Sequence, residues 1–137
     1  MHSTSNVYAN ITAQFPAQVV ATLAELFGDD LQQWRFIIDL FSETVEQDLV
    51  SLEKAIRGSE VVQIVEAAHR IVGSARMLGH QPIGDTARII ERSAHSARPY
   101  HERAAEMQSS ITCLRALADE FRQLARALPW PDSTVAG

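Results

Sequence analysis

One segment of the chain, from Glu66 to Gly79, combines residue types that could carry out group transfer. It holds an imidazole at His69, no side chain at Gly73 and a guanidinium at Arg76. Near pH 7 an unperturbed histidine, with a pKa of about 6.5, is mostly neutral, so a ring nitrogen is free to attack phosphorus. A nearby guanidinium can offset charge on phosphoryl oxygens. These residue types indicate phosphoryl transfer to His69.

Gly73 needs an explanation because its surroundings have helical spacing, and a glycine inside a helix costs about 1 kcal/mol relative to alanine. A neighbouring helix could pack closely against it, or a partner protein could need room to bring a reactive group to His69. At about 100° per residue, Gly73 and Arg76 follow His69 along one edge of the helix. Val65 and Val72 form an apolar shoulder between this edge and the core.

The other histidines and the acidic residues do not form a recognisable metal site. His80, His95 and His101 have no partner at metal-ligand spacing, so we expect solvent-facing or capping roles for them. The acidic residues between positions 39 and 53 are expected to form a solvated helix face. No glycine-rich phosphate loop is present in the sequence, so we expect no metal, no nucleotide and no cofactor in this domain.

Hydrophobic spacing predicts helices along nearly the whole chain. Apolar residues recur at intervals of three and four in four long stretches: Leu31–Ile56, Val61–Leu78, Ile83–Ala94 and Met107–Leu128. A shorter helix is expected near Pro16–Phe27. Four long helices with short connections predict an all-α fold, an antiparallel up-and-down four-helix bundle with a short extra N-terminal helix.

The length of 137 residues indicates one domain. We expect residues 13–128 to form the helical bundle. Both ends are polar or rich in proline, so residues 1–12 are predicted to be a flexible N-terminal segment and residues 129–137 a flexible C-terminal tail.

The overall composition excludes several classes of protein. A formal net charge of −5 argues against nucleic-acid binding through phosphate neutralisation. No apolar run approaches the roughly 18 residues of a membrane-spanning helix, and the first residues do not resemble a secretory signal. The single cysteine, Cys113, excludes an internal disulfide and fits a reducing compartment. We therefore expect a cytoplasmic chain that contacts neither nucleic acid nor membrane.

The segment His69–Gly79 resembles the signature of histidine-containing phosphotransfer (HPt) domains, His-x-Leu-Lys-Gly-Ser-Ala followed shortly by Leu-Gly. The pair Ile90-Glu91 is similar to the Leu-Glu of the family's next helix, and the resemblance covers roughly residues 30–127. It implies that His69 accepts a phosphoryl group from a receiver-domain aspartyl phosphate and passes it to a response-regulator aspartate. It also implies a carrier without kinase activity of its own, either a separate protein or the cytoplasmic end of a hybrid sensor histidine kinase.

One position departs from the family's pattern, because the lysine three residues after the histidine is Val72 here. Arg76 could supply the missing charge, while Arg70 points about 100° away on the helix. We expect six neighbours of His69 to support transfer or to dock the partner: Val65, Glu66, Arg70, Val72, Gly73 and Arg76.

Two other functions stay open at this point. The chain could be a docking module of the same fold that binds receiver domains without being phosphorylated, and Val72 slightly favours this alternative. It could also be a structural or oligomerising bundle in which Gly73 serves helix packing. The complete motif His69–Gly79 argues against a purely structural role.

Overall fold

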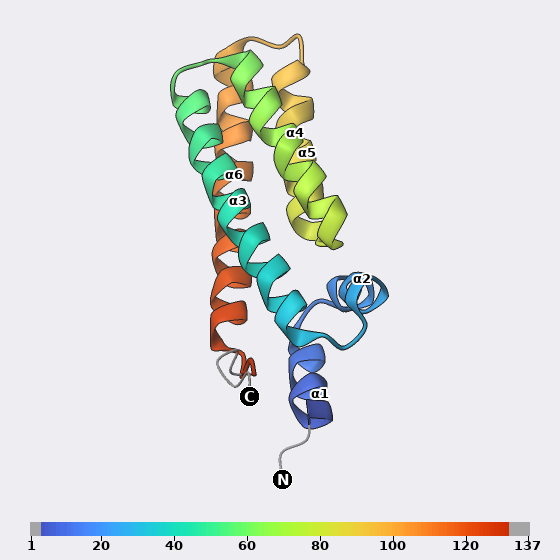
Figure 1. The fold of residues 1–137 in the computed structure, drawn as a ribbon. Helices are drawn as coiled ribbons and strands as arrows, with labels where there is room; N and C mark the ends of the chain where they lie inside the picture. The colour runs from blue at the N-terminus through green and yellow to red at the C-terminus, as the bar shows by residue number, and fades with distance from the viewer. Residues whose placement is uncertain (1–3, 132–137) are drawn as a thin grey trace.

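The computed structural model describes residues 4–131, and all of their regular structure is helical. Six helices follow along the chain: α1 (Thr4–Gln14), α2 (Ala17–Phe27), α3 (Leu31–Arg57), α4 (Val61–Leu78), α5 (Gln81–His95) and α6 (Tyr100–Ala127). Helices α3–α6 form one bundle, and α1 and α2 lie at the end where α3 begins (Figure 1). Each bundle helix packs against the next along the chain, and α6 returns to α3. The predicted all-α four-helix bundle is confirmed.

The core is a continuous apolar cluster to which every helix contributes. Its largest side chains have no exposed surface, among them Trp34, Leu49, Ile64, Ile71, Ile90 and Leu114. Burying a side chain of this size stabilises a fold by about 1.5–3 kcal/mol. The indole nitrogen of Trp34 donates a hydrogen bond to the Gly28 carbonyl at 3.0 Å, so its polar atom is satisfied as well.

The turn between α4 and α5 fixes how these two helices face each other. Gly79 ends α4 with a φ of +87°, a left-handed conformation that glycine adopts without strain. A Cβ at Gly79 would lie 2.6 Å from the Thr22 hydroxyl oxygen, so α2 packs directly on the turn. His80 then caps α5, because its Nδ1 accepts a hydrogen bond from the Ile83 amide at 3.2 Å.

His80 is buried, so the solvent-facing role expected for it is wrong and only the capping role is correct. Its ring stacks on Phe41 at 6.2 Å between centroids and meets the Phe121 ring edge-to-face at 5.0 Å. Burial lowers the pKa of His80 below the usual histidine value. The neutral ring is therefore the form that the fold favours.

The flexible segment predicted for residues 1–12 is wrong where the structure describes it, because α1 begins at Thr4. Ile11 is fully buried, and the Tyr8 ring meets the Trp34 ring edge-to-face at 5.4 Å. Within residues 4–131, two short helices, α1 and α2, therefore precede the bundle where one was expected. Apolar residues spaced by four, Val7, Ile11 and Phe15, place α1 against the bundle end. Residues 1–3 of the predicted segment lie outside the described residues.

The C-terminal tail also differs from the expectation at Trp130. Its indole nitrogen donates to the Ala125 carbonyl at 2.7 Å, and its ring lies 6.1 Å from that of Phe15. Trp130 thus covers the bundle end, while residues 132–137 of the predicted tail lie outside the described residues. Within residues 4–131 no helix combines the length and apolar character that crossing a membrane requires.

Candidate functional site

His69 lies in the middle of α4 with its side chain 74% exposed. Its Nδ1 is 2.9 Å from Oε2 of Glu91 on α5, whose side chain is only 21% exposed. A carboxylate accepts hydrogen bonds and cannot donate them, so Nδ1 carries the proton. The neutral ring then has its lone pair on Nε2. Glu91 therefore orients the imidazole and leaves Nε2 free for chemistry.

The close approach of α4 and α5 allows this contact between residues 22 positions apart. A Cβ added to Gly84 on α5 would lie 3.3 Å from the Ala75 Cβ on α4. The glycine brings the two helix backbones close together just past the turn. The Glu91 carboxylate can then reach the imidazole across the helix pair.

Gly73 lies one turn after His69 and is exposed. A Cβ built on it would meet nothing within 4 Å, so no neighbouring helix requires a glycine here. The explanation by close helix packing is wrong. The absent side chain instead leaves open surface directly beside the imidazole.

A comparison with protein families gives one match, a model described as the Hpt domain, over residues 37–127. This span is well over half of the chain and contains α4, α5 and α6 completely. The chain belongs to the Hpt domain family. No curated protein and no solved structure matches it. The predicted resemblance to this family is confirmed, and family membership implies histidine phosphotransfer within phosphorelay signalling, with receiver domains as the general class of partner.

The supporting residues expected from sequence lie on two sides of α4 in this Hpt domain. Arg70 turns toward α3, where its Nε is 2.9 Å from Oδ1 of Asp48. Glu66 shares a hollow with Arg70 on the same side. These two side chains are therefore directed away from the pair His69–Glu91.

Val72 and Arg76 lie on the side of α4 that faces α5. Val72 is buried, so this position supplies apolar packing and no charge. Arg76 is exposed and has no hydrogen bond or ion pair within the described residues. Val65 is half-buried and packs against the core edge, as the predicted apolar shoulder requires.

An apolar groove of about 340 Å³ lies between α2, α3 and the C-terminal part of α4. Met77, four residues after Gly73, forms its rim with a side chain that is 80% exposed. Residues from three helices line the groove: Leu23, Leu26 and Phe27 of α2, Ile37, Leu40, Phe41 and Thr44 of α3, and Ser74, Met77 and Leu78 of α4. Exposed apolar surface of this kind is typical of protein interaction sites.

Glu91 is not among the site residues that the sequence predicts, although Ile90-Glu91 is similar to the family's pattern. Position in the sequence cannot show that a carboxylate 22 residues away reaches the histidine. The signal that could have found it is the antiparallel pairing of α4 and α5, which brings the middle of one helix opposite the middle of the other.

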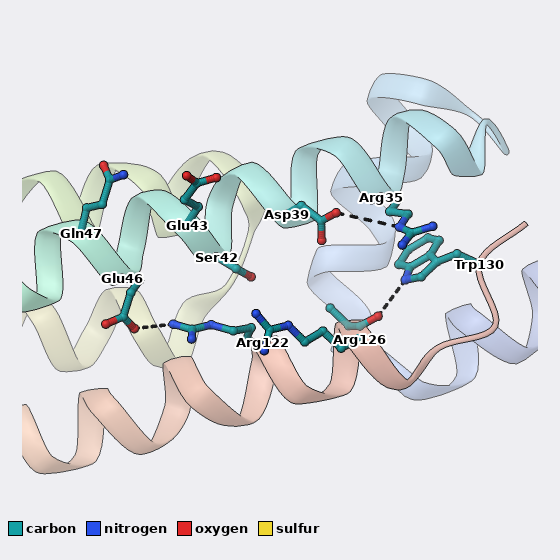
Figure 2. A pocket seen from close by; sticks show the side chains of 10 residues that line it. Arg35, Asp39, Ser42, Glu43, Glu46, Gln47, Arg122, Arg126 and Trp130 are labelled. Atoms are coloured by element: carbon teal, nitrogen blue, oxygen red, sulfur yellow. Dashed lines mark hydrogen bonds and ion pairs between the residues drawn. The ribbon is translucent and has the colours of Figure 1, made fainter. Parts of the chain in front are cut away.

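A second hollow, of about 500 Å³, lies between α3 and α6 (Figure 2). Figure 2 shows Glu46 and Arg122 directed toward each other, and Arg115 also donates to Glu46 at 2.6 Å. Although partial burial alone would raise the pKa of Glu46, these two hydrogen bonds hold it below its usual value. Three arginines and three carboxylates line the hollow. Their charges offset each other, so the hollow favours neither an anion nor a cation. Within the described residues no group of three metal-ligating side chains occurs.

Proposed function

We propose that His69 is the phosphorylated residue of this Hpt domain. It accepts the phosphoryl group from an aspartyl phosphate on a receiver domain and passes it to the aspartate of a response regulator. One observation supports this proposal most: an exposed imidazole whose Nδ1 is held by Glu91 at 2.9 Å, beside open space at Gly73. A receiver can therefore bring its aspartate to Nε2 without meeting a side chain at position 73.

The transfer balances without any further reactant. Nε2 of His69 uses its lone pair to form a bond to phosphorus, and the bond between phosphorus and the aspartyl oxygen breaks. The aspartate leaves with the electron pair as a carboxylate. The proton stays on Nδ1, where the Glu91 carboxylate offsets the positive charge that develops on the ring. The reverse sequence delivers the group to the next receiver.

The Hpt domain needs no cofactor, metal or nucleotide of its own in this scheme, because the aspartyl phosphate supplies the activated group. It acts as a carrier without kinase activity, in the cytoplasm, either separately or attached to a sensor kinase. The groove lined by Met77, eight residues after His69 on α4, gives a receiver apolar surface to contact.

The test is transfer from a phosphorylated receiver to the wild-type domain, to His69→Gln and to His101→Gln. His69→Gln should lose acid-labile, base-stable phosphorylation completely, while the exposed control His101→Gln should be labelled as the wild type is. Equal labelling of His69→Gln would contradict the proposal. A receiver that binds the domain firmly but transfers nothing to it would favour the alternative, a docking module that is not phosphorylated.

A further inference from the structure

Phosphorylation of His69 would concentrate negative charge at one point of the surface. The phosphoryl group carries about −1.5 to −2 charges, and the Glu91 carboxylate is already within hydrogen-bond distance of the ring. Like charges at this separation repel each other. A cation close to Glu91 would be needed to stabilise the phosphorylated state, and Val72 supplies none.

Two arginines, one on α4 and one on α5, line a cavity between these helices and are candidates for this cation. The cavity, of about 450 Å³, is lined by Val72 and Arg76 of α4 and by Arg88 of α5. Neither guanidinium makes a hydrogen bond or an ion pair with any residue between 4 and 131. In contrast, Arg70, Arg98, Arg115 and Arg122 are all paired with carboxylates.

Arg88 has the better position of the two. It precedes Glu91 by three residues, so it lies on the same side of α5 and about 4.5 Å along the helix axis. Arg76 follows His69 by seven residues, about 10 Å along α4. Arg88 is half-buried and lines the cavity, and its guanidinium has no partner among residues 4–131. Asp85, the carboxylate in the same cavity, lies one turn farther from Glu91 and forms no ion pair with Arg88.

We propose that Arg88 binds the phosphoryl oxygens of phosphorylated His69, so that the helix carrying Glu91 also supplies the compensating cation. Arg88 is thus a specificity-determining residue for the dianionic phosphoryl group. This inference rests on the proposed function of His69. Arg76 contributes a more distant charge on the other wall of the cavity.

The test labels His69 chemically with phosphoramidate, a small phosphodonor that requires no receiver. The ³¹P signal that is absent in His69→Gln is then followed during a pH titration. A nearby cation stabilises the dianion and lowers the phosphoryl pKa, so Arg88→Met should raise the titration midpoint by about half a unit. Arg88→Lys keeps a cation at this position, so its titration midpoint should stay close to that of the wild type. Transfer from a phosphorylated receiver to Arg88→Met should be several-fold slower than to the wild type.

The matched control is Arg92→Met, which removes the same charge one turn later on α5, from an exposed arginine outside the cavity. It should leave the midpoint unchanged. An unshifted midpoint in Arg88→Met, or an equal shift in Arg92→Met, would overturn the role of Arg88. If phosphoramidate labels His69 but no receiver transfers to it, the proposed function fails. The titration midpoint then still tests whether Arg88 binds the phosphoryl group. No label at His69 would overturn both.

Discussion

At the scale of single residues, the hydrogen bond between His69 and Glu91 determines what the imidazole can do. It places the proton on Nδ1 and presents Nε2 to solvent. It also fixes the ring plane of a side chain that is otherwise 74% exposed and would sample several rotamers. Orientation by a second group is a common way to prepare a nucleophile for attack.

Replacing Glu91 should therefore slow phosphotransfer without removing it. Glu91→Ala should reduce the single-turnover rate by roughly tenfold, because the ring loses both its orientation and the charge that stabilises it. Glu91→Gln should fall between, since an amide oxygen still accepts from Nδ1 but carries no charge. Glu120→Ala, an exposed glutamate on α6, is the control. A wild-type rate for Glu91→Ala would show that the contact has no catalytic role.

At the scale of helices, a side chain at Gly73 should have opposite effects on receiver binding and on stability. The open space beside it means that Gly73→Leu should fold, and the better helix propensity of leucine should raise the melting temperature by roughly 2–4 °C. The leucine should nevertheless weaken receiver binding about tenfold, because it occupies the surface beside His69. Gln63→Leu, also exposed on α4, is the matched control for both measurements. A lower melting temperature for Gly73→Leu would contradict the account.

The cap of α5 makes stability depend on pH. Burial lowers the pKa of folded His80, so the unfolded chain binds more protons below about pH 6.5. This contribution to the free energy of unfolding is complete above that pH and is lost as the pH falls toward the folded pKa. Between pH 7 and pH 5, denaturant titrations should show that His80→Asn loses less free energy of unfolding than the wild type does. The asparagine amide oxygen can still cap α5. Equal losses in both proteins would refute the assignment.

The sequence predicts best the helices that have one long apolar stripe. In α3 the apolar residues that recur every three or four positions are also the buried ones. Helix α1 was missed because it is short and largely polar, and only the bundle end makes Ile11 a core residue. The burial of His80 was missed for the same reason, since Phe41 and Phe121 come from other helices. Within the site, the motif identified His69 and Gly73. Glu91 and Arg88 required the pairing of α4 with α5.

At the scale of the whole molecule, one pair of helices is joined by a network of ion pairs and another pair carries the reacting groups. Charged side chains tie α3 to α6, where Arg115 bridges Glu46 and Glu53 at 2.6 and 2.7 Å. Helices α4 and α5 carry the imidazole, its orienting carboxylate, and Arg76 and Arg88, which have no ion pair within residues 4–131. The apolar groove runs from α4 toward α2 and α3, so a receiver bound over His69 could also contact these helices.

The nitrogen and the histidine that carry the phosphoryl group after transfer from a receiver can be identified by NMR. Two-bond nitrogen–proton correlation spectra of ¹⁵N-labelled domain report this for every imidazole, before and after phosphorylation. We expect one phosphorylated ring, that of His69, with the proton on Nδ1 before transfer and phosphorus on Nε2 after it. Phosphorus on Nδ1 of His69, or on another histidine, would contradict this expectation.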